Sequence, residues 1–119
     1  MACSTADPPT GLSAINSNKT VVLKWTAPGG PCQVRRYDVQ RAQGNFPTLA
    51  CALTTPATCT FTDITPNGIT GTPPKTTFTD NSKLQNNTFY TYFVTETNAQ
   101  GATSGASNPK VILVLFSTK

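Results

Sequence analysis

Hydrophobic and polar residues alternate along most of the chain with a period of two, which is typical of half-buried β-strands. In residues 20–26, for example, Val21, Leu23 and Trp25 share one face, and the other face is polar except for one valine. Proline, glycine and asparagine separate such segments, as expected where turns join short strands. The pattern predicts strands at residues 10–16, 20–26, 34–42, 48–53, 59–62, 76–80, 88–98 and 110–117.

This spacing of about seven strands predicts an all-β fold, an antiparallel sandwich of two sheets. The composition agrees, because the 22 threonines, six phenylalanines and three tyrosines suit pleated, half-buried surfaces. No segment shows a helical period. A length of 119 residues matches one domain. We assign residues 1–8 to an N-terminal tail and residues 9–119 to that domain.

Three motifs within this pattern carry a family resemblance. Trp25 lies in the second predicted strand, Tyr37 lies in the third, and the segment 84–90 (Leu-Gln-Asn-Asn-Thr-Phe-Tyr) leads into a long strand. Together they resemble the fibronectin type III family of seven-stranded, immunoglobulin-like β-sandwiches. The resemblance implies a tyrosine corner, in which a phenol bonds back to the backbone near the preceding turn. It also implies a structural core that contains Trp25, Tyr37, Leu84 and Tyr90.

The chain departs from the family's pattern in two places. Residues 54–75 are longer than the usual connection and predict an added hairpin or flap. Glu96 stands at an inward position that the family gives to a small apolar residue, which indicates that the strand's exposed end lies there. An immunoglobulin domain is disfavoured, because the second and sixth strands contain no cysteine for its inter-sheet disulfide.

The four cysteines favour disulfides over a zinc site or free thiols, because the chain has neither a histidine nor a Cys-x-x-Cys motif. The strand directions implied by the resemblance put Cys3 and Cys32 at the same pole and pair them. Cys51 and Cys59 are then left to close the added segment. Disulfides indicate an oxidising setting, either the extracellular space or the surface of a released virion.

Charge and motif content argue against several classes of protein. The net charge of +4 is dispersed, and the densest basic group, Arg35, Arg36 and Arg41, lacks the interleaved aromatics of a nucleic-acid interface. No apolar stretch reaches the roughly 18 residues of a membrane span. Scattered acids, the absence of histidine and the absence of nucleophile or phosphate-loop motifs predict no enzyme, cofactor or metal. Asp63 and Asp80 are interpreted as turn caps rather than calcium ligands.

The last predicted strand is apolar at every position from 111 to 116, whereas a strand with one solvated face should alternate. On the same sheet, the inward phase of Tyr90 and Tyr92 leaves their phenylalanine neighbours pointing outward. Either residues 54–75 cover this face, or the face is an interface to another copy or a host surface. The interface candidates are Phe89, Phe93, Ile112, Val114 and Phe116.

These observations favour a non-enzymatic structural and interaction module with protein partners. The leading hypothesis is a virion-surface protein, a phage capsid decoration or tail-associated component, because the chain starts at Met1 without a secretory signal and has disulfide potential. Its partner would be a capsid or tail assembly, another copy of itself or a host surface. The alternative is an extracellular module of a secreted carbohydrate-active enzyme or adhesin, acting as a spacer or glycan binder.

Overall fold

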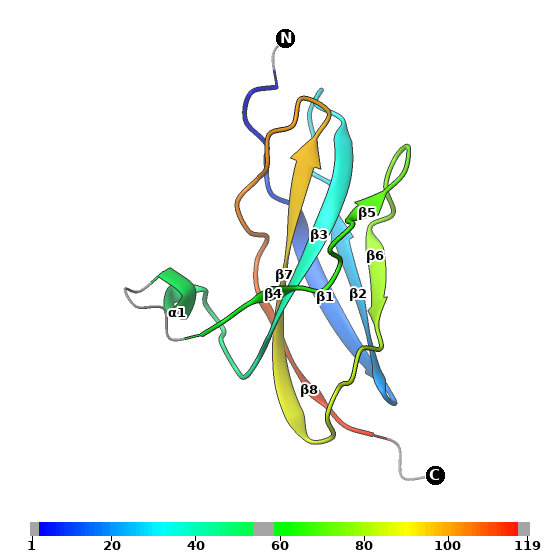
Figure 1. The fold of residues 1–119 in the computed structure, drawn as a ribbon, viewed down its shortest axis with the longest axis vertical. Coiled ribbons are helices and arrows are strands. Elements are labelled where there is room, and N and C mark those ends of the chain that lie inside the picture. The colour runs from blue at the N-terminus through cyan, green and yellow to red at the C-terminus, as the bar shows by residue number, and fades with distance from the viewer. Residues whose placement is uncertain (1–2, 54–58, 117–119) are drawn as a thin grey trace.

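The computed structural model describes residues 3–53 and 59–116. The strands in this part of the chain are β1 (Thr10–Ser17), β2 (Thr20–Thr26), β3 (Val34–Gln43), β4 (Thr62–Asp63), β5 (Ile69–Thr70), β6 (Thr77–Asp80), β7 (Thr88–Asn98) and β8 (Lys110–Val114). They form two antiparallel sheets packed face to face (Figure 1), which confirms the predicted sandwich. One sheet has the order β1-β2-β6, and the other has the order β4-β3-β7-β8 with β5 also paired to β3.

Strands β2 and β7 have the bounds that the alternation predicts, and both lie between two neighbours in their sheets. The longest ladder joins β3 to β7, from Val34 opposite Asn98 to Gln43 opposite Tyr90. Because successive side chains point to opposite faces, each central strand sends alternate residues into the space between the sheets. That space is the hydrophobic core.

Aromatic side chains from both sheets fill this core. The Trp25 ring packs edge-on against Tyr37, with 5.3 Å between ring centroids. Leu84 and Tyr90 are also buried. The Gln85 backbone N–H donates a hydrogen bond of 2.8 Å to the phenol oxygen of Tyr90. This bond is the tyrosine corner that the family resemblance implies, and it holds the turn before β7 against the strand.

A buried carboxylate links the two sheets. Asp80, at the end of β6, is 1% exposed and accepts hydrogen bonds from Tyr92 Oη (2.6 Å) and Arg41 Nη1 (2.9 Å) of the opposite sheet. It also accepts bonds from the backbone N–H and hydroxyl of Ser82, which is the predicted turn cap. Burial alone would raise the pKa of Asp80, but the hydrogen bonds from Ser82, Tyr92 and Arg41 outweigh it and lower that pKa.

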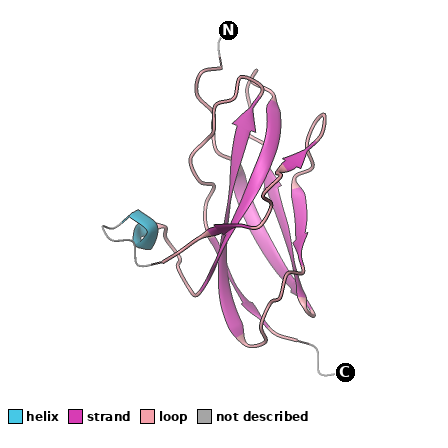
Figure 2. Cartoon of the chain, viewed as in Figure 1, coloured by secondary structure: helices cyan, strands magenta, loops and turns pink. Residues whose placement is uncertain are grey.

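The strand predicted at residues 48–53 is wrong, because this segment contains the short helix α1 (Ala50–Leu53). The Thr48 hydroxyl accepts a bond of 3.4 Å from the Ala50 backbone N–H, and alanine and leucine favour the helical backbone. Figure 2 shows that the helix lies outside the sandwich. The Cys51–Cys59 bridge closes the segment that follows.

The segment expected to form an added hairpin or flap, residues 54–75, adds two short strands to the sheet. Its residues 54–58 lie outside the described part of the chain, but β4 and β5 both pair with β3. The strand predicted at residues 59–62 starts only at Thr62, and β5 was not predicted. A turn joins the two strands, in which the Gly68 N–H donates to the Thr65 carbonyl at 2.7 Å. Gly68 has a φ of 71°, a conformation that favours glycine.

Strand β8 ends at Val114, earlier than predicted, because side chains take over its backbone hydrogen bonds. The Leu115 N–H donates to Asn16 Oδ1, and the Phe116 N–H donates to Asn86 Oδ1, both at 2.8 Å. The final residue of the predicted strand, 117, lies outside the described residues.

We predict that Asp80→Asn lowers the free energy of unfolding by about 3 kcal/mol, because it leaves the Arg41 charge without its buried partner. This is the lower end of the usual cost, since 22% of the Arg41 side chain is exposed to water. Chemical denaturation of the wild type, Asp80→Asn, Arg41→Gln and the double variant would measure the coupling. Additive single-variant effects would contradict the role assigned to this pair.

The same variant tests the pH dependence. Because folding lowers the pKa of Asp80, its contribution is present above its ordinary pKa of 3.8 and is lost as the pH falls through the folded value. The stability difference between the wild type and Asp80→Asn should therefore shrink below that pKa. Denaturation at a series of pH values measures it, and a constant difference down to the acid limit would contradict the assignment.

Candidate functional site

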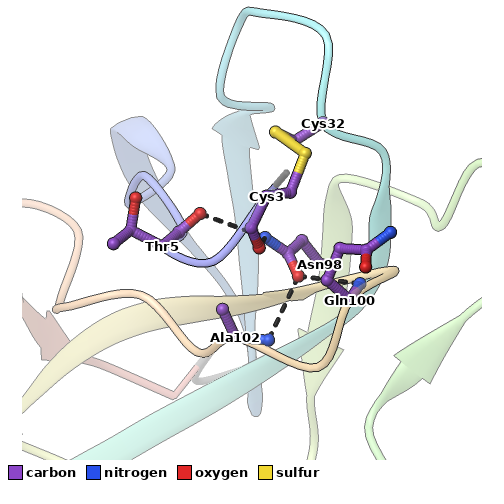
Figure 3. The surroundings of a disulfide bond; sticks show 6 residues. All are labelled: Cys3, Thr5, Cys32, Asn98, Gln100 and Ala102. Carbon is purple, nitrogen blue, oxygen red and sulfur yellow. Dashed lines mark hydrogen bonds between the residues drawn. A yellow bond between two sulfur atoms is a disulfide. The ribbon is translucent and has the colours of Figure 1, made fainter. Parts of the chain in front are cut away.

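The N-terminal tail is fastened to the end of the sandwich where β7 finishes. Cys3 forms a disulfide with Cys32 of the β2–β3 loop. The second disulfide joins Cys51 to Cys59, so both pairings are those expected from the resemblance. Figure 3 shows the Asn98 side chain beneath the first bridge. Asn98 Nδ2 donates to the carbonyl oxygens of Cys3 (3.0 Å) and Thr5 (3.1 Å).

The other end of the same amide holds the loop after β7. Asn98 Oδ1 accepts hydrogen bonds from the backbone N–H groups of Gln100 (2.9 Å) and Ala102 (3.1 Å). A side chain that is 1% exposed thus joins the tail to this loop. The disulfide adds the β2–β3 loop, so three segments are held together at one end of the molecule, which we call the N-terminal pole.

A groove of about 920 Å³ lies beside this pole. One wall is the β2–β3 loop with Pro28, and the other is the β5–β6 loop with Pro73 and Pro74. Val34 and Tyr37 of β3 also line it. The walls are anchored to the framework by backbone bonds of 3.0 Å from Trp25 N–H to the Thr76 carbonyl and from Ala99 N–H to the Gln33 carbonyl.

The charges in the groove have one sign. Arg35 and Lys75 line it, and none of its lining residues in the described part of the chain is acidic. The β5–β6 wall turns at Gly71, whose φ of 146° and close approach to the Pro73 carbonyl disfavour any larger residue. An apolar groove with a few placed charges is typical of a binding site.

Glu96 lies at the pole, and the expectation that it marks an exposed strand end is wrong. It is 2% exposed, because the tail and the β2–β3 loop lie over this end of β7. Burial, and secondarily the charge of Asp7, raise the pKa of Glu96. A raised pKa is the usual response of a carboxyl group that loses its hydration without gaining a cation.

The five interface candidates do not share one exposed face. Val114 is fully buried, and Ile112 packs against the core, because Ile112 pairs with the inward-facing Tyr90. Phe116 also packs against the core, with Lys19 Nζ 5.8 Å from its ring centroid. Phe89, which is 42% exposed, and Phe93 remain on the outer side.

Much of that outer side is covered. The Phe61 ring lies 5.0 Å from the Phe93 ring and 6.4 Å from the Phe46 ring, measured between centroids. Hydrogen bonds fasten the chain around Phe46 to β7: the Thr91 hydroxyl donates to the Gly44 carbonyl and accepts from the Phe46 backbone N–H. The residues that cover this face therefore include Phe46, which precedes position 54. From residues 54–75, the segment expected to cover the face, Phe61 makes the contact.

The remaining acids act as structural groups. Asp63 Oδ1 accepts bonds from the backbone N–H (2.8 Å) and hydroxyl (3.0 Å) of Thr65, as expected of a turn cap. Within residues 3–53 and 59–116, no three histidine, cysteine, aspartate or glutamate side chains lie close enough to hold a metal together. In the same ranges, no helix has the length and hydrophobicity needed to cross a membrane.

The two sheets, the tyrosine corner and the inter-sheet core define an immunoglobulin-like β-sandwich module. The chain belongs to the fibronectin type III family, because the model of the fibronectin type III domain matches residues 7–112. Such a domain is a non-catalytic module of the kind that typically binds proteins. No curated protein matches the chain.

Several solved structures share this fold. The fn3 domain of the human collagen alpha-1(XX) chain has a TM-score of 0.64 and 19% identity, with 100% of this chain and 94% of that one covered. A titin module from human cardiac muscle has a TM-score of 0.63 and 24% identity, covering 92% of each. A multidomain titin crystal structure has a TM-score of 0.65 and 21% identity; the match covers 93% of this chain and 32% of that one. At these identities the likeness shows the fold alone.

Sequence reasoning did not find the groove. The proline and glycine residues of its walls, such as Pro28 and Pro73, were interpreted as turn signals, and Arg35 as part of a dispersed basic group. Nothing in the local pattern reveals that two loops separated in sequence by β3, α1, β4 and β5 meet beside β3. The signal that comes nearest is the presence of two proline-rich turns beside strands that are neighbours in the family's fold.

We predict that Cys3→Ser/Cys32→Ser lowers the free energy of unfolding by about 3–4 kcal/mol, because that bridge restricts a long loop of the unfolded chain. The bridge spans 29 residues, whereas Cys51–Cys59 spans 8. The matched variant Cys51→Ser/Cys59→Ser should therefore lose less, about 2–3 kcal/mol. Guanidinium denaturation measures both. A greater loss for the shorter bridge would contradict the prediction.

Proposed function

We propose that this chain is a non-enzymatic binding module whose groove beside the N-terminal pole takes an extended segment of a protein partner. The observation that carries the proposal is the groove itself, with apolar walls and two positive side chains. The partner segment is expected to carry apolar side chains next to an acidic one. Charge complementarity of this kind mainly sets specificity and the rate of association.

The arrangement favours a protein partner over a glycan. Tyr37, the aromatic side chain in the groove, is 1% exposed and therefore offers little ring surface for stacking a sugar. The walls instead offer the rings of Pro28 and Pro73. Two walls fixed to the framework also reduce the ordering cost of binding, because less of the site must be immobilised.

The setting that we propose is extracellular, on the strength of two disulfides in one small domain. The virion-surface role and the spacer role in a secreted enzyme or adhesin are finer hypotheses for the same module. The match to the fibronectin type III family does not distinguish between these two roles. The proposal therefore rests on the groove and holds in either setting.

Selection from a displayed library of random linear peptides tests the binding. We predict enrichment of peptides that combine acidic and apolar residues, with binding to the isolated domain measured by calorimetry. Arg35→Glu/Lys75→Glu should weaken binding by at least tenfold, which corresponds to about 1.4 kcal/mol.

The matched control is Lys83→Glu, another charge reversal at an exposed lysine. Lys83 lies in the loop after β6, at the end of that strand away from the groove. The control should bind like the wild type. Failure to enrich any such peptide, or an equal loss in the control, would rule out the groove as the binding site.

A further inference from the structure

A second hollow lies at the N-terminal pole and shares Pro28 and Cys32 of the β2–β3 loop with the groove. Its volume is about 230 Å³, and it is enclosed by the tail, that loop and the end of β7. Asp7 and Glu96 line it, and no lysine or arginine of residues 3–53 or 59–116 does. The hollow therefore collects negative charge without a neutralising side chain of its own.

Glu96 is the unusual group in this hollow. Both of its backbone groups are hydrogen-bonded: its N–H donates to Ser104 Oγ (3.0 Å), and its carbonyl accepts from the Ser104 N–H (2.8 Å). Its side chain differs, since Oε1 is buried and has no hydrogen-bond partner among the described residues. A buried carboxylate oxygen without a partner is costly, and such groups in proteins are normally paired or bound to a metal.

The other buried acids show what is missing. Asp80 binds Arg41 at 2.9 Å, and Asp38 binds Arg36 at 2.6 Å. Glu96 has an acid, Asp7, as its electrostatic neighbour instead. Burial, and secondarily the charge of Glu96, raise the pKa of Tyr37 on β3. Two carboxylates that face one hollow repel each other unless a cation or a proton lies between them.

The remaining lining favours a hard cation. The tail contributes Thr5, and the loop contributes prolines and glycines, none of which carries a cationic side chain. Hard divalent cations take oxygen ligands from carboxylates, peptide carbonyls and water. Calcium accepts irregular geometry of this kind, whereas magnesium requires a near-ideal octahedron.

We propose that this hollow binds a divalent cation of calcium size, with the carboxylates of Glu96 and Asp7 as its charged ligands. Two carboxylates make a weak site, with a dissociation constant of about 10⁻⁴–10⁻³ M, as in extracellular modules. The bound ion joins the tail and the β2–β3 loop to β7, and it thereby reinforces the disulfide and Asn98 at the same pole.

Calcium chloride titration of the metal-free protein tests the proposal. Calcium at about ten times the dissociation constant should raise the melting temperature by about 5 °C, because it binds the folded state alone. Calorimetry should show one binding site. The absence of both a shift and a heat of binding would overturn the proposal, as would an equal shift with magnesium or with sodium chloride at matched ionic strength.

Two variants tie the effect to the hollow. Glu96→Gln and Asp7→Asn should each remove the calcium-dependent shift, and Glu96→Gln should leave the metal-free protein at least as stable, because it removes a buried charge. If Glu96→Gln fails to fold, the exposed Asp7 keeps the test decisive. The matched control is Asp63→Asn, whose acid does not line the hollow and which should retain the shift. A full calcium response in both hollow variants would overturn the site.

Discussion

The carboxylate of Asp80 is the polar contact on which the closure of the sandwich depends. It lies between the sheets, and each of its oxygens has at least one partner, from Ser82 on one side and from Arg41 and Tyr92 on the other. Burial makes these bonds strong, and it makes the loss of any one of them costly. The aromatic core around Trp25 packs between the two sheets that this contact joins.

The two ends of the molecule treat buried charge in opposite ways. At Asp80, hydrogen bonds from the opposite sheet and from Ser82 satisfy the carboxylate, and its pKa is lowered. At the N-terminal pole Glu96 keeps an unpaired oxygen, and its pKa is raised. The first arrangement stabilises the framework, whereas the second leaves a buried oxygen of Glu96 for a bound cation to satisfy. Grooves, strained loops and the disulfide-bound tail gather at this second end, as is typical where a rigid scaffold presents loops for binding.

The framework could be predicted from the sequence because it depends on local alternation and a few specific residues. The period of two gives β2 and β7 their bounds, and the residues around Tyr90 identify the corner. The segment from 48 to 53 could not be predicted, since its short apolar run fits a strand or a helix and the outcome depends on whether a partner strand is present. The burial of Glu96 was also beyond local reasoning, because the segments that cover it are distant in sequence.

The interface predicted on the outer face of the β7–β8 sheet was likewise beyond local reasoning. Alternation correctly placed Phe93 outward, but it contained no information on the Phe61 ring that packs over it. It also could not show the register in which Ile112 pairs with Tyr90, and this register decides which face of β8 is buried. Strand β8 lies at the edge of its sheet. It is apolar from Val111 onward because its inward residues join the core and its outward residues are half-buried.

The central claim is that a rigid framework carries a binding surface that is energetically separate from it. Native-state amide hydrogen exchange tests this claim most directly. The account predicts that core amides of β2, β3 and β7 exchange only through global unfolding, with one common free energy, and that Arg35→Glu/Lys75→Glu leaves this value unchanged. A loss of protection across these strands in that variant would contradict the claim, because the groove would then be part of the framework itself.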